Sequence, residues 1–386
     1  MSTTSSSSPP KMAILDDYHS LAAPHFSHIP ASTLSVTRLD PLPPLTPSTL
    51  PQYTKALHPY TIFSTMRERT ALPRALLASL PNLRLVLGTG SQFETFDRAA
   101  MAELGIALVA APAQGRVDGT GKWRGRGLVG SAKNGGGHPT TQHAWALILA
   151  LARNVAGDDA VVKGKTRAGG VAQGGWQTTL ATGLQGLTLG VVGLGRLGAA
   201  VARVGVLAFG MRVVCWSENL SQDKADGMAV EMGLPVVGGG LAEEGEKTFR
   251  FVGKEEVFQR ADVVTLHYVL SERSRGLVGE KELAAMKPNA YFVNTSRGPL
   301  VEEKALFETL MEGRIKGAAL DVFDIEPLPV DSPWRTEDWD EPGKSRVLLT
   351  PHMGYVEEGT INTWYEESAE NLERWLDGRE LLHRLV

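Results

Sequence analysis

The chain has one cysteine, Cys215, among 386 residues. A single thiol cannot form an intramolecular disulfide, and the opening residues MSTTSSSSPP lack the apolar core of a secretory signal. The sequence therefore predicts a protein of a reducing, cytoplasmic compartment. Cys215 lies in the apolar run MRVVCW with no base beside it in the sequence, which favours a core residue over a nucleophile.

Long apolar runs and an excess of one charge are also lacking. The longest apolar stretches, such as residues 144–152, are far shorter than the roughly 20 residues that a helix needs to cross a bilayer. Lys and Arg number 39, Asp and Glu number 43, and the formal net charge is -4, so no nucleic acid or other polyanion is expected as a partner. No Cys, His and carboxylate cluster has metal-ligand spacing, and His138 and His143 do not share a helical face. No membrane span and no metal are predicted.

Strand and helix signals alternate from residue 187 to residue 351. Such alternation predicts a parallel, doubly wound sheet. Similar but less regular signals begin at Lys11, with prolines interrupting them between residues 24 and 59. The expected fold class is α/β, with two Rossmann-like or flavodoxin-like domains, doubly wound parallel sheets and a cleft between the domains.

The length of the chain also favours two domains. Residues 1–10 are a Ser/Pro tail, and the glycine-rich region 114–139 predicts a mobile loop because it cannot pack a core of its own. An all-round apolar segment, 140–154, predicts a buried helix that links the domains, and 357–376 predicts an amphipathic helix that packs back on the first domain. The expected domains are a substrate domain and an NAD(P)-binding domain, with the bounds 11–140 plus 355–386 and 141–354.

A glycine turn opens the second alternating region. The segment LTLGVVGLGRLG places Gly193, Gly195 and Gly198 in GxGxxG spacing after a strand and before a helix. The first glycine permits a tight turn, the second lets the backbone approach a pyrophosphate, and the third allows close helix packing. The pattern alone is weak evidence in a chain with 42 glycines. Its strand-turn-helix context favours a dinucleotide site over a simple glycine turn.

The next strand, MRVVCW, ends at candidates for binding the adenosine ribose. Ser217, Glu218 and Asn219 follow it, about 20 residues past the glycines. A carboxylate that accepts the ribose hydroxyls favours NAD, and Glu218 would repel a 2'-phosphate. Ser217 is small enough to tolerate that phosphate, so NADP stays open. No arginine directly follows the strand to bind a phosphate, which places NAD first.

Seven ordered motifs resemble one family of enzymes. They are LRLVLGTG, WALILALAR, GLTLGVVGLGRLG, DVVTLHYVLS, MKPNAYFVNTSRGPLVEEKAL, GAALDVFDIEP and LTPHMGY. Their order is that of the D-isomer-specific 2-hydroxyacid dehydrogenases, and the chain is similar to the phosphoglycerate-dehydrogenase-like branch. The resemblance implies an NAD(P)-dependent oxidoreductase, assembled as a homodimer, that interconverts a small 2-keto acid and a D-2-hydroxy acid.

The resemblance implies a catalytic set of Arg297 in NTSRG, Glu326 in DVFDIEP and His352 in TPHMGY. A guanidinium binds a carboxylate bidentately and polarises the adjacent carbonyl. An imidazolium protonates the developing alkoxide, and a carboxylate that is hydrogen-bonded to the imidazole orients it. Each residue alone also fits a structural role, as an ion pair, a turn carboxylate or a core histidine. All three follow predicted strand ends, at the edge where open α/β sheets bind ligands.

The resemblance also implies further contacts with cofactor and substrate. Asp321 is expected to bind the nicotinamide carboxamide, and Thr295 and Ser296 to line the nicotinamide ribose. Further cofactor-binding positions are expected at Arg196, Leu197, Val269 and Gly354. The substrate carboxylate is expected at the backbone of Gly88, Thr89 and Gly90. Arg67 follows a strand of the first domain, where it either adds a positive contact for the substrate or lies on a solvated face.

Departures from the family pattern leave the substrate open. The chain has the insertion 114–139, Val269 where proline is common, Gln142 where glutamate is common, and Ser217 where NAD users place aspartate. The formate-oxidising relatives carry glutamine at the position of Glu326, so the glutamate favours a 2-hydroxy acid. An alternative function, which the catalytic set does not exclude, is an NAD(H)-sensing corepressor or regulatory binding protein on the same fold.

Overall fold

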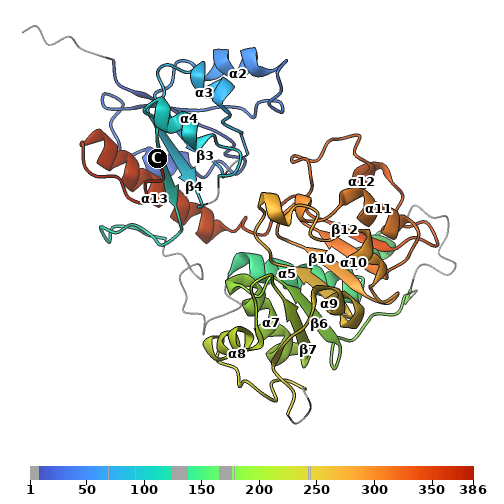
Figure 1. Ribbon diagram of the computed structural model, residues 1–386. Coiled ribbons are helices and arrows are strands. Elements are labelled where there is room, and N and C mark those ends of the chain that lie inside the picture. Colours follow the sequence, from blue (N-terminus) through green and yellow to red (C-terminus); the bar gives the residue numbers. More distant parts are fainter. Residues whose placement is uncertain are drawn as a thin grey trace, which may run out of the picture. The chain divides into compact units, whose positions relative to one another are not determined.

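The computed structural model describes residues 8–67, 69–91, 93–123, 138–164, 176, 177, 179–241, 243 and 245–386. The chain divides into two compact units, shown in Figure 1. The first unit comprises Met1–Val129 and Glu357–Val386, and the second comprises Gly130–Val356. Each unit contains one parallel sheet with helices packed on it, which confirms the predicted α/β fold class.

The first unit is built on a five-stranded parallel sheet in the order β2-β1-β3-β4-β5. Its strands are β1 (Lys11–Ile14), β2 (Ser35–Arg38), β3 (Ile62–Thr65), β4 (Leu85–Thr89) and β5 (Ala107–Ala111). Its helices are α1 (Ala23–Phe26), α2 (Leu50–Leu57), α3 (Arg74–Ala78), α4 (Arg98–Glu103) and α13 (Glu358–Leu376). Apolar side chains of α2, α3 and α4 share a core with Phe63, Val86 and Leu108. Alternate strand residues point to opposite faces, and α13 packs against β4 and β5.

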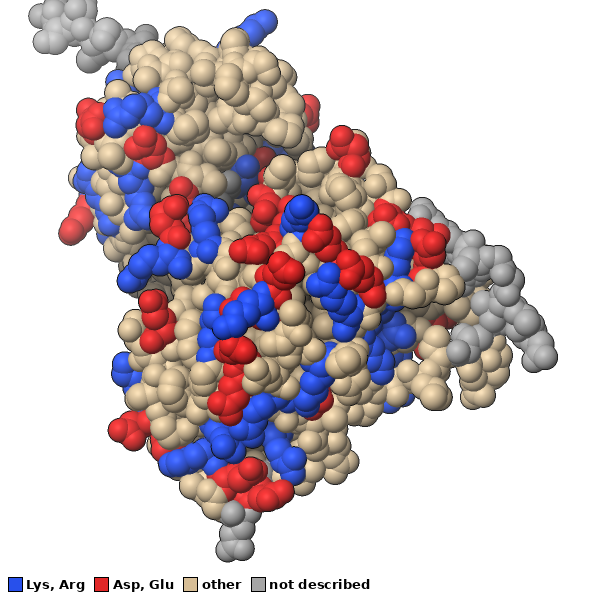
Figure 2. All heavy atoms as spheres, turned by 45° about the vertical axis from the view of Figure 1, so that its right-hand side comes forward, with Lys and Arg blue, Asp and Glu red and all other residues tan. Residues whose placement is uncertain are grey.

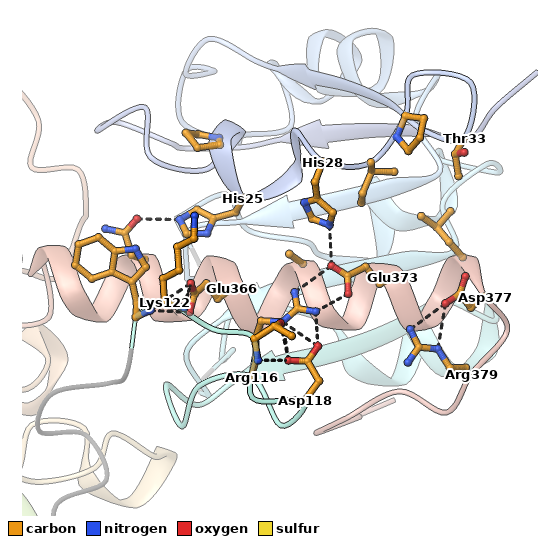
Figure 3. Close-up of a pocket in the computed structure, with 18 of the residues that line it drawn as sticks. His25, His28, Thr33, Arg116, Asp118, Lys122, Glu366, Glu373, Asp377 and Arg379 are labelled. Atoms are coloured by element: carbon orange, nitrogen blue, oxygen red, sulfur yellow. Dashed lines mark hydrogen bonds and ion pairs between the residues drawn. The ribbon is translucent and has the colours of Figure 1, made fainter.

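A row of four glutamates on α13 holds the segment that follows β5. This glutamate row consists of Glu366, Glu367, Glu370 and Glu373, and Figure 3 shows two of its members with their partners. The row accepts hydrogen bonds from backbone N–H groups and from two side chains, which belong to Ala113, Gly115, Val117, Lys122, Trp123, Arg116 and His28. The loop predicted over 114–139 is therefore anchored as far as residue 123, which sequence patterns did not indicate. Its remaining residues up to 137 lie outside the described part of the chain.

Glu367 is the member of the row with the most strongly altered acidity. Its side chain is buried, and the loss of hydration raises its pKa to about 7. The N–H groups of Ala113 at 2.8 Å and Gly115 at 2.6 Å favour the charged form, but the neighbouring Glu370 adds to the rise. Near neutral pH this carboxyl therefore exchanges its proton inside the fold.

The second unit is built on a seven-stranded parallel sheet in the order β12-β11-β10-β9-β6-β7-β8. Its strands are β6 (Thr188–Val192), β7 (Arg212–Trp216), β8 (Phe249–Phe251), β9 (Val263–Leu266), β10 (Tyr291–Asn294), β11 (Gly317–Leu320) and β12 (Arg346–Leu349). The chain winds outward from β6 first toward β8 and then toward β12, so the winding reverses between β6 and β9. This is the doubly wound order that the alternation predicted, with β8 as a strand that the sequence patterns did not reveal.

Helices cover both faces of the second sheet. The helices of this unit are α5 (Pro139–Arg153), α6 (Val155–Val162), α7 (Arg196–Phe209), α8 (Gln222–Glu231), α9 (Lys254–Arg260), α10 (Glu280–Ala284), α11 (Glu303–Met311) and α12 (Pro333–Thr336). Trp145, Val206 and their neighbours form one core with α5, α7 and α8. Phe258, Leu283 and Leu306 belong to another core, with α9, α10 and α11. Because both faces are covered, the strands are mostly apolar on both sides rather than alternating, with exceptions such as Arg250 in β8 and Thr265 in β9.

The register of the second sheet aligns the ends of its strands. One row of paired residues crosses six strands and contains Trp216, Val192, Leu266, Asn294, Leu320 and Leu349. The residues that follow this row therefore lie along one edge of the sheet, its carboxyl edge. They are Ser217, Gly193, His267, Thr295, Asp321 and Thr350. Three of the predicted cofactor positions and the first glycine of the turn are thus brought to the same edge.

The surface carries both signs of charge. On the face that Figure 2 shows, basic and acidic side chains are interspersed over the described residues, in keeping with the formal net charge of -4. Among the helices that the structure describes, none has the combination of length and apolarity that a membrane span requires.

We expect Glu367→Gln to reduce the pH dependence of stability near neutral pH. A glutamate titrates at about 4.3 in an unfolded chain, whereas Glu367 titrates at about 7 in the fold. Its contribution is fully present below the unfolded value and is lost as pH rises through the folded value, by at most about 1.4 kcal/mol per pH unit. Thermal unfolding between pH 5 and 8 should therefore show a flatter profile for Glu367→Gln than for the parent protein.

The matched control is Glu103→Gln. Glu103 is exposed, and its hydrogen bond with Arg74 holds the pKa of the carboxyl below its usual range. That variant should keep the parent profile above pH 5. A Glu367→Gln protein with the parent profile would contradict the prediction.

Candidate functional site

The glycine turn after β6 combines two close packing contacts with one open position. Gly193 has φ +100°, and a Cβ there would stand 2.5 Å from the carbonyl oxygen of His267. A Cβ at Gly198 would overlap the carbonyl oxygen of Gly193. A Cβ at Gly195, directly before α7, would meet nothing within 4 Å. The first and third glycines are needed for packing, and the second leaves room for a ligand at the helix N-terminus, where phosphate binds favourably.

The end of β7 lies beside this turn. The Ser217 hydroxyl accepts the N–H of Leu194 at 3.0 Å, so this residue also fixes the glycine turn. Glu218 and Asn219 are exposed, and the Glu218 N–H donates to the Tyr268 hydroxyl at 3.3 Å. The Glu218 carboxylate is thus placed at the carboxyl edge with access to solvent. Tyr268 is a residue of this corner that the sequence motifs did not single out.

The turn after β10 is fixed by the side chain of Asn294. Its amide donates to the carbonyl of Arg297 at 2.9 Å, and its oxygen accepts the N–H of Ser296 at 3.0 Å. The Ser296 hydroxyl donates to the carbonyl of Leu266 at 2.9 Å, which ties the turn to β9. The Thr295 hydroxyl is buried and has no hydrogen-bond partner among the described residues. Such an orphaned group fits a place where a ligand supplies the partner.

Gly298 joins the turn of Arg297 to the turn that carries Glu326. A Cβ at Gly298 would overlap the carbonyl group of Phe323 and stand 2.5 Å from the N atom of Asp324. The Glu326 carboxylate in turn accepts the N–H of Phe323 at 3.0 Å. The turns after β10 and β11 therefore pack backbone against backbone, which only glycine permits.

His352 and Glu326 form a close pair. Nδ1 of His352 lies 2.5 Å from a carboxylate oxygen of Glu326, and the two side chains are 15% and 22% exposed. His352 has φ +57°, an unusual value for a residue with a side chain, and its N–H donates to the carbonyl of Asp321 at 2.8 Å. Among the described residues, Nε2 of His352 has no hydrogen-bond partner. The pair can therefore hold a proton on Nδ1 and exchange another at Nε2.

The carboxylate of Asp321 lies under this turn with no exposure to solvent. One oxygen accepts hydrogen bonds from His143 at 3.0 Å, from Thr350 at 2.5 Å and from the N–H of Met353 at 2.7 Å. The other accepts the N–H of Gly354 at 2.9 Å. Burial raises the pKa of Asp321, but the hydrogen bonds from His143 and Thr350 outweigh it, and the pKa is lowered overall. The carboxylate is therefore ionised inside the protein.

The other predicted cofactor positions are spread along the same edge. Arg196 and Leu197 open α7. Val269 follows β9 and is 64% exposed, and its carbonyl accepts the Ser274 hydroxyl at 2.8 Å. Gly354 is the most constrained position of this group, because its carbonyl also accepts the hydroxyl of Thr140 at 2.9 Å.

The predicted substrate residues lie together in the first unit. Arg67 has φ +53°, and its N–H donates to the hydroxyl of Thr89 at 2.7 Å. A Cβ at Gly90 would stand 2.6 Å from a guanidinium nitrogen of Arg67, so the glycine gives this side chain its room. The guanidinium also lies 5.9 Å from the centre of the Trp364 ring. Arg67, Gly88, Thr89 and Gly90 thus form one cluster at the ends of β3 and β4.

Residues 145–354 match the family model described as D-isomer specific 2-hydroxyacid dehydrogenase, NAD binding domain. The chain belongs to the D-isomer-specific 2-hydroxyacid dehydrogenase family. This confirms the resemblance found in the sequence motifs. The second unit accordingly contains the NAD-binding domain of this family, with the glycine turn at its centre.

Named relatives include reductases and dehydrogenases of the same family. The chain is 31% identical to a glyoxylate reductase of Aeropyrum pernix over 336 residues, which are 83% of this chain and 84% of the relative. It is 30% identical to a D-3-phosphoglycerate dehydrogenase of Methanocaldococcus jannaschii over 323 residues, 83% of this chain but only 51% of that protein. The chain thus spans about half the length of that relative.

Solved structures of the family share the fold. A phosphoglycerate oxidoreductase of Vibrio cholerae superposes with a TM-score of 0.72 at 29% identity, with 96% of this chain and 99% of that chain covered. A D-lactate dehydrogenase of Escherichia coli superposes with a TM-score of 0.68 at 21% identity, covering 97% of this chain and all of that one, which shows the common fold.

Sequence reasoning missed several polar groups of this family site. His143 was considered only for metal spacing, and Thr350 and Asn294 were read as parts of motifs. One signal was available for the latter two, since both stand at or directly after a strand end. Among the described residues, no group of three or more Cys, His, Asp or Glu is arranged to hold a metal ion. Cys215 lies in the core, where burial raises the pKa of its thiol to about 12.

We expect Gly298→Ala to lower both stability and the integrity of the site. The new methyl group would meet backbone atoms of Phe323 and Asp324, which cannot rotate away. Overpacking of this kind costs about 1–3 kcal/mol, measurable by chemical denaturation. Gly227→Ala is the matched control, because a Cβ there meets nothing within 4 Å on α8 and should stabilise by about 0.5–1 kcal/mol. Equal stability of the two variants would contradict the packing argument.

Proposed function

We propose that this protein is an NAD(P)-dependent D-2-hydroxyacid dehydrogenase that interconverts a small 2-keto acid and the D-2-hydroxy acid. Its proposed catalytic set is Arg297, Glu326 and His352. The observation that carries the proposal is the 2.5 Å contact between His352 and Glu326, because His352 follows β12 of the sheet whose β6 leads into the glycine turn of an NAD-binding domain. Acid-base catalysis next to a hydride carrier is the chemistry that this arrangement supports.

The pair of His352 and Glu326 supplies the proton. In the direction of reduction, Nε2 of His352 donates a proton to the carbonyl oxygen of the substrate, which becomes the hydroxyl. Glu326 bonds to Nδ1, keeps the ring oriented, and stabilises the imidazolium before the proton leaves. The nicotinamide, when bound, supplies the hydride to the carbonyl carbon.

Arg297 binds the carboxylate of the substrate and polarises the carbonyl. Its guanidinium offers two parallel N–H donors, a geometry that a carboxylate matches. The Asn294 side chain fixes the carbonyl of Arg297, and Gly298 fixes the turn from the other side. In the first unit, the backbone of Gly88–Gly90 is proposed to receive the substrate carboxylate, and Arg67 to add a second positive contact for the anionic substrate.

The residues of the second unit fit a dinucleotide. Room at Gly195 suits the pyrophosphate, and the orphaned hydroxyl of Thr295 suits the nicotinamide ribose. The Glu218 carboxylate is exposed at the end of β7, where it is proposed to accept hydrogen bonds from the adenosine ribose hydroxyls, which supports NAD over NADP. Ser296 and Asp321 already bond within the protein, so their contacts with the nicotinamide half stay proposals.

Two substrate classes follow from the relatives, and one alternative function is not favoured. Relatives named glyoxylate reductase and D-3-phosphoglycerate dehydrogenase point to short 2-keto acids and to phosphorylated ones. A regulatory NAD(H)-binding protein would have no need of a close His352–Glu326 pair, and no described feature supports it. A homodimer stays a proposal from the family resemblance.

The decisive test is turnover of ketoacids by the parent protein and by His352→Gln. We expect oxidation of NADH with at least one of glyoxylate, hydroxypyruvate, phosphohydroxypyruvate and pyruvate, followed as absorbance at 340 nm. His352→Gln removes the general acid and should lower kcat at least about 100-fold, while NADH still binds. His58→Gln changes an exposed histidine of the first unit and should keep full activity. Undiminished turnover by His352→Gln would refute the catalytic role.

A second test separates cofactor binding from stability at Thr295. Thr295→Val replaces a buried hydroxyl that has no partner within the described part of the chain, so the free protein should be equally stable or more stable. If the hydroxyl bonds to the ribose, the Kd for NADH should rise about 5-fold to 10-fold, the loss of roughly one hydrogen bond. Thr309→Val is the matched control, since its hydroxyl on α11 is also buried without a partner. An NADH affinity that falls equally in both variants would exclude a ribose contact.

A further inference from the structure

His143 reaches the site from α5, an element that carries none of the proposed catalytic residues. Its Nε2 atom lies 3.0 Å from an oxygen of Asp321, 178 positions away in the sequence, and 3.1 Å from the hydroxyl of Thr350. The imidazole is mostly buried, with 18% of its side chain exposed. The histidine thus contacts the one buried carboxylate that lies beneath the turn of His352.

The four groups that donate hydrogen bonds to the Asp321 carboxylate come from two different elements. Thr350, Met353 and Gly354 belong to the same short segment as His352, so their bonds move together with the turn they hold. His143 is the remaining donor, and it belongs to a different element. Its bond therefore fixes Asp321, and with it the whole segment 350–354, relative to α5.

Helix α5 is hydrogen-bonded to the segment 350–354 at a second point. The Thr140 hydroxyl donates to the carbonyl of Gly354 at 2.9 Å. With contacts from Thr140 to Gly354 and from His143 to Thr350, one helical turn apart, α5 holds both ends of the bend that follows β12. A bend held at two points resists rotation as well as translation.

The backbone at His352 needs such support. A left-handed conformation at a residue with a side chain is strained and persists only when its surroundings enforce it. The backbone angles also determine the direction of the imidazole, because the allowed χ1 rotamers of a side chain depend on the φ and ψ angles of its residue. A shift of the turn would change both the contact with Glu326 and the direction of Nε2.

We propose that His143 is a positioning residue for His352, acting through Asp321 to hold the turn that directs the imidazole. The proposal rests on the proposed dehydrogenase function only where its test measures kcat and KM. It assigns a role within the site to a helix that otherwise packs against the sheet. His143 does not touch the substrate in this scheme and transfers no proton to it.

The test compares two substitutions at the same position. His143→Leu removes the donor to Asp321, whereas His143→Gln keeps an N–H donor at about the reach of Nε2. We expect kcat to fall about 10-fold in His143→Leu, the scale of a small misplacement of a catalytic group, with the KM for NADH changed by less than about 3-fold. His143→Gln should restore kcat to within about 3-fold of the parent, and His58→Leu should leave it unchanged.

A second readout does not depend on turnover. Imidazole ¹⁵N shifts, with the signal of His352 assigned from its loss in His352→Gln, report the ring's tautomer and its bond to Glu326. We expect the His352 signal to be displaced in His143→Leu and retained in His143→Gln. If His143→Leu fails to fold, His143→Asn, whose shorter side chain does not reach Asp321, removes the same bond and carries the same expectation.

The outcomes separate this inference from the proposed function. A His143→Leu protein with lowered stability but an unchanged His352 signal and an unchanged kcat would overturn the positioning role and leave a structural one. A parent protein that reduces no 2-keto acid would sink the proposed function alone, because the His352 signal still decides the role of His143.

Discussion

The carboxylate of Asp321 carries its charge at a position without solvent contact. Burying an ionised group is tolerated only when several donors replace its hydration. Here the donors come from α5, from the end of β12 and from the backbone of the turn that follows. A shift of any of these elements would remove a hydrogen bond from the buried carboxylate and leave its charge less well compensated. The strained backbone of His352 persists because it is part of this arrangement.

The parallel sheet explains why the site can form at all. The strands of the second unit are covered on both faces and are therefore mostly apolar, so most polar groups lie at or just beyond the strand ends. Since the register aligns six of those ends, polar residues widely separated in sequence share one edge. The turns between them still need close contact, and Gly193 and Gly298 supply it by having no side chain.

The sequence was sufficient for those parts of the fold that follow from local patterns. Alternating strands and helices predicted the second sheet, and the glycine spacing predicted the turn before α7. The missed strands were β8, with three residues, and β2, which is mostly exposed and lies among prolines. Neither is long or apolar enough to give a periodic signal.

The site shows the same division between local and distant information. Glu326 and His352 were expected together because the family resemblance pairs them, and they lie in contact. The role of His143 in holding Asp321 depends on a contact between residues 178 positions apart, for which no local pattern exists. Likewise, the glutamate row of α13 looked like one polar face of an amphipathic helix. Only the folded chain shows its carboxylates bonded to the backbone of residues 113–123.

Carboxylates of similar burial behave differently here because their donors differ. Asp321 receives an imidazole, a hydroxyl and two N–H groups, and its pKa is lowered. Glu367 receives backbone N–H groups only, has the acidic Glu370 beside it, and its pKa rises to about 7. Burial alone therefore does not set the charge of an acid; the number and kind of its donors do. In this protein, His143 of α5, a side-chain donor from another element, is among the groups that keep the carboxylate beneath the imidazole ionised.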